Sequence, residues 1–205
     1  MGGALAAASL ARRGVAALAA AMARAGGWGF LALSALIAFD VLGRRFLGVS
    51  TGATTEIGGY ALASGLSWGL AHALARRTHV RIEVLVDRLP PRARRPLHLL
   101  ALAALAAFAA VLAWSAWGLV EESHLFGATD ISALRIPLVV PQGLWALGIG
   151  VFLVLALLML AENALLLLAG RGEAVERNLR ARSDAEEAEE ALEAIGAGPG
   201  RAAPP

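Results

Sequence analysis

The chain has 205 residues, of which 58% are hydrophobic and 17% are charged, and its mean hydropathy is +0.66. Ordinary soluble domains carry about 25% charged residues, so this composition excludes a typical soluble domain. No cysteine is present, which excludes a disulfide framework, a thiolate metal cluster and a cysteine nucleophile. All 18 basic residues are arginine and the net charge is only +2, so the high isoelectric point reflects arginine and does not indicate nucleic acid.

Four apolar segments are long enough to cross a bilayer. A spanning helix needs about 20 apolar residues, because about 30 Å of hydrocarbon is crossed at about 1.5 Å per residue. The segments lie at about 26–43, 57–75, 97–120 and 142–168. The first is the weakest, because Asp40 falls near its end, where a charge costs less than at the bilayer centre. The sequence therefore predicts an all-α integral membrane protein with four transmembrane helices.

The arginines are distributed unevenly among the predicted loops. Fifteen lie before the first span, between the second and third spans or after the fourth, and three lie in the other two loops. Cytoplasmic loops carry an excess of basic residues, so both termini and the middle loop are expected to be cytoplasmic. The periplasmic face then carries two connections, around Arg44 to Glu56 and around Glu121 to Pro141.

The two ends of the chain are expected to lie outside the bilayer. We interpret residues 1–25 as a cytoplasmic or interfacial segment, with a cleaved signal peptide as the alternative. Residues 170–205 carry five arginines and eight acidic residues, with Glu173 and Arg177 at helical spacing. This pattern predicts a charged cytoplasmic helix to about Ile195 and a disordered Gly/Pro end, which serves either a partner or solubility alone.

The middle loop interleaves aliphatic and charged side chains before a Pro-Pro pair, so it is not expected inside hydrocarbon. We expect an amphipathic segment along the cytoplasmic interface, with its arginines at anionic lipid head groups. Alternatively, these arginines act only as topology signals. The candidate interfacial residues are Arg76, Arg77, His79, Arg81 and Glu83. A metal role for His79 is disfavoured because no ligand set is completed around it.

Small side chains recur every four residues along the second predicted span, at Ala61, Gly65, Gly69 and Ala73. Membrane helices approach closely through such faces, which suggests a contact with another subunit. Packing within the protein's own bundle explains the pattern equally well.

The sequence shows no transport site of its own. Secondary transporters usually place substrate at Gly- or Pro-interrupted helices in two related repeats near the midplane, and no such pair is evident. An accessory subunit of a transporter is therefore the leading interpretation. A self-contained, homo-oligomeric small exporter is the alternative, and a membrane-embedded enzyme is disfavoured because no catalytic set, metal site or cofactor motif is apparent.

Several short stretches together resemble one family. They begin with Asp40-Val-Leu-Gly-Arg-Arg-Phe and Thr54-Thr-Glu-Ile-Gly-Gly-Tyr, continue with Arg77-Thr-His-Val-Arg-Ile-Glu, and end with Ser132-Ala-Leu-Arg-Ile-Pro followed by Pro141-Gln-Gly-Leu. Their order and spacing resemble the small transmembrane (DctQ-like) subunit of tripartite ATP-independent periplasmic (TRAP) transporters. The resemblance extends from about residue 30 to residue 168.

The resemblance implies a complex in the bacterial inner membrane. In that family a larger membrane subunit carries the substrate and sodium sites, and a periplasmic binding protein delivers an organic acid, often a carboxylate, for uptake by symport driven by an ion gradient. By motif position, Arg44 matches the family's arginine after the first span, and Glu56 matches the acid that opens the second span. His79 and Glu83 match the histidine and the acid that follow the second span. Asp40 and Arg45 depart from the asparagine and the aromatic residue that are usual there.

The corner between the first two spans is the candidate structural site. Asp40 and Arg44 are four residues apart on one predicted helix, so they can pair, and Glu56 opens the next helix on the same side. We hypothesise that these three residues fix the outer hairpin that supports the large subunit. A charge cluster with only a folding role is the alternative.

Overall fold

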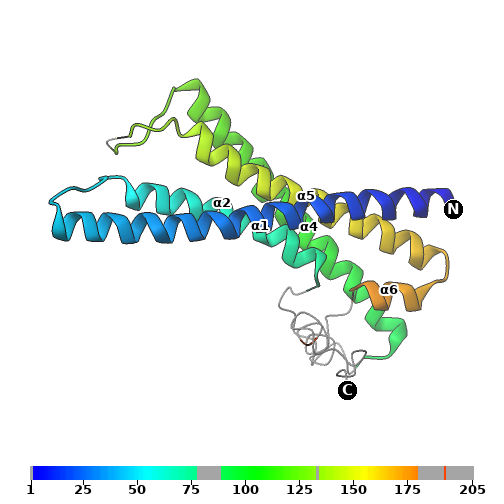
Figure 1. Ribbon diagram of the computed structural model, residues 1–205. Helices are drawn as coiled ribbons and strands as arrows, with labels where there is room; N and C mark the ends of the chain where they lie inside the picture. Colours follow the sequence, from blue (N-terminus) through cyan, green and yellow to red (C-terminus); the bar gives the residue numbers. More distant parts are fainter. Residues whose placement is uncertain (1, 78–88, 133, 180–191, 193–205) are drawn as a thin grey trace, which may run out of the picture.

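The computed structural model describes residues 2–77, 89–132, 134–179 and 192. Five helices make up most of these residues, and they are labelled in Figure 1. The helices are α1 (Gly2–Phe46), α2 (Thr54–Ala75), α4 (Pro91–Leu125), α5 (Val139–Leu168) and α6 (Gly172–Leu179). Outside them, the described part of the chain contains one isolated antiparallel bridge, between Thr129 and Pro137. The expectation of an all-α chain is therefore confirmed.

The long helices run through alanine- and leucine-rich sequence and end near glycines. Gly48, Gly127 and Gly170 follow the ends of α1, α4 and α5, and all three have a positive φ. Glycine adopts this left-handed conformation without a steric penalty from Cβ, which is why it commonly terminates helices. At the other end of a helix, Pro91 opens α4, where its missing N–H leaves no intrahelical hydrogen bond unmade.

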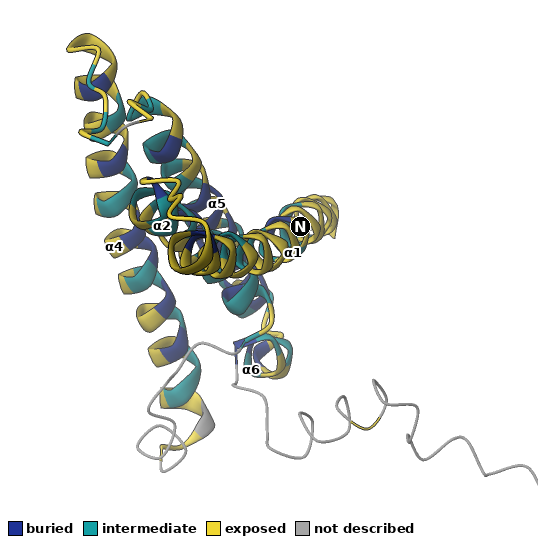
Figure 2. Cartoon of the chain, turned by 60° about the vertical axis from the view of Figure 1, so that its left-hand side comes forward, coloured by how far each residue is buried: buried dark blue, intermediate teal, exposed yellow. Residues whose placement is uncertain are grey.

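The bundle consists of two helical hairpins packed against each other (Figure 1). α1 pairs with α2, α4 pairs with α5, and α5 also packs against α1 and α2. In Figure 2 the buried residues follow the faces where helices meet, and exposed residues cover the outward faces. α5 lies at the centre, because its buried residues, including Phe152, Leu155 and Ala156, form much of the hydrophobic core.

Close approach between the helices fixes their relative positions. A Cβ added to Gly26 would lie 3.4 Å from the Cα of Gly65, so α1 and α2 nearly touch there. A Cβ added to Gly148 on α5 would overlap Ser67 of α2. Small residues at such contacts allow two backbones to come close together, which is how membrane helices gain packing energy.

The ends of the bundle differ, and we name them for their contents. The loop end contains the α1–α2 loop (residues 47–53) and the α4–α5 loop (residues 126–138). The arginine end contains Arg12 of α1, the residues that follow α2, the first turns of α4, the last turns of α5, and α6. α6 packs at this end through Val175 and Leu179, which are almost completely buried.

Three of the described helices, α1, α4 and α5, are long and apolar enough to cross a membrane. The expected fourth span, α2, is not among them, although it has 22 residues. Its sequence carries Ser64, Ser67, Glu56 and His72 as well as several glycines, which lower its hydropathy. The side chains of Ser64 and Ser67 are buried in the bundle. A crossing by α2 therefore depends on its neighbours and stays a prediction.

The first helix is longer than the expected span. α1 continues for 45 residues without a break at residues 25 and 26, and it is about 68 Å long at about 1.5 Å per residue. Ala19 and Met22 lie in the terminal segment 1–25, which was expected outside the bilayer, yet both belong to the hydrophobic core. The cytoplasmic position of that segment stays a prediction. The expected amphipathic segment falls mostly on residues 78–88, and most of the expected C-terminal helix beyond α6 falls on residues 180–195; apart from Leu192, both lie outside the described residues.

Candidate functional site: polar ends and an apolar groove

Asp40 is the centre of a local hydrogen-bond network at the loop end. Its side chain is 2% exposed, although it lies near the end of α1. Arg44, one turn later, donates to Oδ2, and Oδ1 accepts the hydroxyl of Ser50 at 3.0 Å and that of Thr51 at 3.0 Å. The backbone N–H of Thr51 also donates to Oδ1, at 2.7 Å. The carboxylate thus ties the end of α1 to the loop that leads into α2.

Glu56, the third residue predicted at the corner between the first two spans, does not join the Asp40 network. Glu56 lies in the first turn of α2 and is half buried. The groups that bind Asp40 come from Arg44, Ser50 and Thr51, and Glu56 is not one of them. The structure therefore brings together two of the three predicted residues, while the role of all three toward a large subunit stays a prediction. Arg45, which departs from the family pattern, is exposed.

A second contact at the loop end was not anticipated from the sequence. The hydroxyl of Tyr60 on α2 donates to Oδ2 of Asp130 in the α4–α5 loop, at 2.9 Å. Oδ1 of Asp130 accepts from the hydroxyl and the backbone N–H of Ser132. Burial raises the pKa of the Asp130 carboxyl, but the hydrogen bonds from Ser132 and Tyr60 outweigh it and hold the pKa below its ordinary value. The Tyr60–Asp130 contact joins the two hairpins.

Part of the small-residue face of α2 packs against α1, and part of it faces away from the bundle. Gly65 faces α1, because a Cβ there would lie 2.5 Å from Cζ of Phe30, and Ala61 lines the same crevice between α1 and α2. A Cβ on Gly69 would meet no atom within 4 Å, so this glycine faces open space, and Ala73 is half buried. Gly65 therefore serves packing within the bundle, and a contact with another subunit stays a prediction for the rest of the face.

Charged side chains from distant parts of the sequence meet at the arginine end. Nε of Arg12 on α1 lies 2.5 Å from Oε2 of Glu162 on α5, and the Glu162 side chain is only 9% exposed. Arg94 and Arg95 of α4 reach Glu176 of α6 at 2.6 and 3.6 Å. Each ion pair joins two helices, so the charges at this end hold the bundle together.

Two residues predicted as interfacial, Arg76 and Arg77, directly follow α2 at this end. Nη1 of Arg77 donates to the backbone carbonyl of Arg177 in α6, at 2.7 Å. Arg77 has a φ of 61°, a left-handed conformation that is uncommon for a residue with a side chain. His79, Arg81 and Glu83 lie outside the described residues. Across the described ranges, no group of three or more histidines and acids gathers where it could hold a metal ion.

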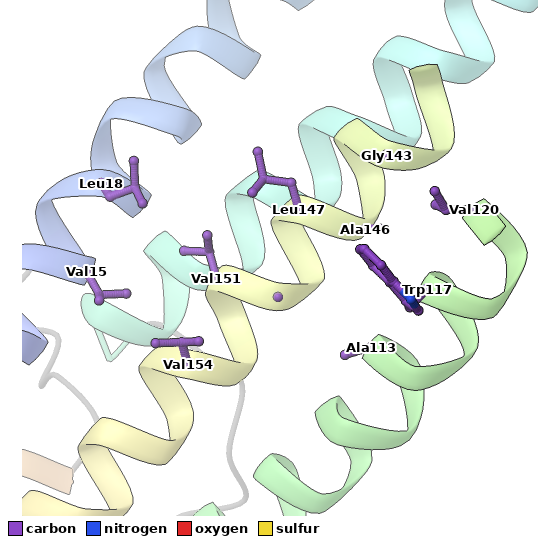
Figure 3. A pocket seen from close by; sticks show the side chains of 11 residues that line it. Val15, Leu18, Ala113, Trp117, Val120, Gly143, Ala146, Leu147, Val151 and Val154 are labelled. Carbon is purple, nitrogen blue, oxygen red and sulfur yellow. The ribbon is translucent and has the colours of Figure 1, made fainter. Parts of the chain in front are cut away.

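An apolar groove of about 600 Å³ runs along α5 (Figure 3). Val15 and Leu18 of α1 stand on one side, and Ala113, Trp117 and Val120 of α4 stand on the other. The floor is α5, where small residues alternate with aliphatic ones, and the lining is almost entirely apolar. The floor residues are Gly143, Ala146, Leu147, Gly150, Val151 and Val154.

The groove and the arginine-end ion pairs were not predicted from the sequence. Leu18 and Trp117 are 51% and 68% exposed, so large apolar side chains border the groove without being covered. Gly143 and Gly150 are seven residues apart on α5, a spacing that places both on one face. This spacing was a signal in the sequence, although glycine and alanine are too abundant in the chain for it to be decisive.

Together, the three long apolar helices and the charged ends of the bundle define a multi-pass helical membrane protein. The family model for the DctQ component of tripartite ATP-independent periplasmic transporters matches residues 33–166, more than half of the chain. The chain belongs to this family, and it is therefore a transporter component, the small membrane subunit, and not an enzyme. The family implies association with a large membrane subunit and a periplasmic binding protein. Comparisons with curated proteins and with solved structures found no match.

Proposed function

We propose that this chain is the scaffold on which the large TRAP subunit is held in the bacterial inner membrane, with both termini in the cytoplasm. The large subunit then takes up an organic acid, a carboxylate delivered by the periplasmic binding protein, by symport with sodium. Support comes from membership of the family and from the arginine distribution, which favours a cytoplasmic arginine end. On this orientation the loop end faces the periplasm.

The apolar groove is the observation that carries the scaffold role. Its walls and floor lie on α1, α4 and α5, the three helices that are apolar enough to cross the membrane. Within lipid, association is driven by close packing, and glycines in the floor let a foreign helix approach the α5 backbone. We therefore assign the groove to one transmembrane helix of the large subunit.

Two further roles are proposed for the predicted residues. Asp40, Arg44 and Glu56 fix the periplasmic hairpin beside the large subunit, supported by the Asp40 network at the loop end. The segment from Arg76 to Glu83 lies at anionic lipid head groups, supported by its alternating charged and aliphatic residues. Gly69, where a Cβ would meet no atom within 4 Å, extends the contact surface on α2.

The groove assignment is tested by filling the groove. A Cβ on Gly143 or Gly150 would meet no atom within 4 Å, so Gly150→Leu fits within this chain and projects into the groove. We expect the variant to fold normally and to lose co-purification with the large subunit and uptake. Gly118→Leu is the matched control, because Gly118 also faces open space but does not line the groove. Unchanged co-purification by Gly150→Leu and by Gly143→Leu would contradict the assignment.

The alternative of a self-contained exporter makes a different prediction. An exporter would move solute across vesicles containing this chain alone, whereas a scaffold requires the large subunit and the binding protein. We expect no transport by the chain alone, and uptake only when all three components are reconstituted.

A further inference from the structure

A polar cavity of about 200 Å³ lies at the arginine end, separate from the apolar groove. Four parts of the chain line it: α1, the end of α2 with the residues that follow it, α5 and α6. Its polar lining residues are Arg12, Arg77, Asn163, Arg177 and Asn178. Because a water molecule takes up about 30 Å³ of liquid, this volume accommodates a group several times larger than water.

The polar side chains that line the cavity are basic residues and amides, which are hydrogen-bond donors. Three arginines line it, and one of them, Arg12, pairs with Glu162. Guanidinium groups present several N–H donors in a planar fork, which matches the oxygens of a phosphate group.

Four of the five polar lining residues, all except Arg177, have side chains held by a contact before any ligand binds. Asn163 is 1% exposed, and its Nδ2 donates to the carbonyl of Met159 at 2.8 Å while its Oδ1 accepts from Asn178 at 3.3 Å. Glu162 fixes Arg12, and the carbonyl of Arg177 fixes Arg77. A ligand that enters therefore meets groups that are already ordered, which lowers the entropic cost of binding.

The surroundings favour one source of phosphate. The cavity lies where α1, α2 and α5 approach the end of their apolar sequence, and Met159 and Ala75 form an apolar part of its lining. A lipid head group at this depth would place its phosphate among the arginines and its acyl chains along the helices. A cytoplasmic leaflet rich in anionic lipid supplies such groups at high local concentration.

We propose that this cavity binds the phosphate of an anionic phospholipid head group. The proposal rests on the proposed cytoplasmic position of the arginine end, and it adds a defined lipid site to the scaffold. Arg12 and Arg177 contact the phosphate oxygens, and the ordered amides of Asn163 and Asn178 form the wall behind it. The bound lipid joins α1, α5 and α6 at the membrane surface.

The test uses the full chain in a neutral detergent and follows its melting temperature. Short-chain phosphatidylglycerol is titrated against phosphatidylcholine of the same chain length and against inorganic phosphate. We expect a saturable rise in the melting temperature with phosphatidylglycerol and little with the other two. A full rise with inorganic phosphate at millimolar concentration would overturn the head-group source, and equal rises with both lipids would overturn the site.

Arg177→Gln is the decisive variant. The Arg177 side chain is exposed, and the backbone carbonyl that holds Arg77 remains in the variant. Loss of one charge-assisted hydrogen bond is expected to weaken phosphatidylglycerol binding by roughly tenfold. Arg13→Gln removes the same charge from an exposed position outside the cavity and is expected to bind normally. Unchanged binding by Arg177→Gln and by Asn178→Ala would overturn the proposal.

Failure of the lipid site is distinguishable from failure of the scaffold. Lipid binding is measured on this chain alone, whereas the scaffold role is measured by co-purification of the large subunit. A wild-type chain that binds phosphatidylglycerol but captures no large subunit would contradict only the scaffold. A chain that captures the large subunit without preference for phosphatidylglycerol would contradict only the lipid site.

Discussion

The two ends of the bundle hold their charges in different ways. At the loop end, every recorded partner of Asp40 lies within 11 residues of it. At the arginine end, Arg12 and Glu162 are 150 residues apart in the sequence, and Arg94 and Arg95 of α4 pair with Glu176 of α6. The local network shapes one turn, whereas the distant pairs set how helices pack. Substitutions at the arginine end should therefore lower the stability of the whole bundle, and substitutions in the Asp40 network should affect one hairpin.

The largest effect is expected from breaking the Arg12–Glu162 pair. Arg12→Ala leaves the carboxylate of Glu162, almost buried, without its partner, and we expect a loss of about 3 kcal/mol in the free energy of unfolding. Reversible unfolding in mixed micelles, followed by tryptophan fluorescence, measures the change.

Two further variants show whether the pairing itself causes that loss. Exchange of the two residues, Arg12→Glu with Glu162→Arg, should recover part of the stability, because the opposite charges meet again. Arg13→Ala, at an exposed neighbouring position, should change the stability little. If Arg13→Ala lowers the free energy of unfolding as much as Arg12→Ala does, the loss does not come from the ion pair between Arg12 and Glu162.

A smaller effect is expected at Asp40. Asp40→Ala removes the acceptor of Thr51 N–H and of the two hydroxyls, and we expect a loss of about 2 kcal/mol. Asp40→Asn keeps an oxygen that can accept the same hydrogen bonds and should lose less than half as much. Hydrogen exchange should show the change in residues 47–53 and leave α5 protected, and loss of protection in α5 would contradict a purely local network.

The Tyr60–Asp130 contact is the exception at the loop end, because it joins residues that are 70 positions apart in the sequence. Tyr60→Phe removes one hydrogen bond and should cost about 1 kcal/mol. The pKa of Asp130 is lowered in the folded state, so its contribution is present above the ordinary value of 3.8 and is lost as the pH falls through the folded-state value. Tyr60→Phe should reduce the loss of stability below about pH 4. An identical acid profile in the variant would show that Tyr60 does not stabilise the carboxylate.

The same division explains what could be predicted from the sequence. The all-α fold and the apolar α1, α4 and α5 follow from composition and from runs of apolar residues, which require no knowledge of tertiary contacts. The pairing of Asp40 with Arg44 follows from their spacing of four on a helix. The participation of Ser50 and Thr51 depends on the loop turning back at Gly48 and Gly52, whose conformations the sequence does not specify uniquely.

The distant contacts could not be predicted, for a physical reason. Arg12, Glu162 and Asn178 belong to three different helices, and the packing of α1 and α6 on α5 brings them to one place. The position of α5 in the bundle depends in turn on close approaches such as Gly148 against Ser67 of α2. Glycine is frequent throughout the chain, so no single glycine marks the contact in the sequence. The full length of α1 could not be predicted either, because its alanine-rich first half is only weakly apolar.

The smallest effect on stability is expected at Arg44, and it separates folding from assembly. The Arg44 side chain is 65% exposed, and exposed ion pairs contribute about 0–1 kcal/mol, so Arg44→Gln should change the free energy of unfolding by less than about 1 kcal/mol. The hydrogen bonds from Ser50 and Thr51 keep Asp40 in place. If the exposed guanidinium supports the large subunit, Arg44→Gln should nevertheless reduce co-purification and uptake. Arg45→Gln is the control, because it removes an exposed charge at the neighbouring position. If Arg44→Gln forms a normal complex with the large subunit, the loop-end network contributes to folding and not to assembly.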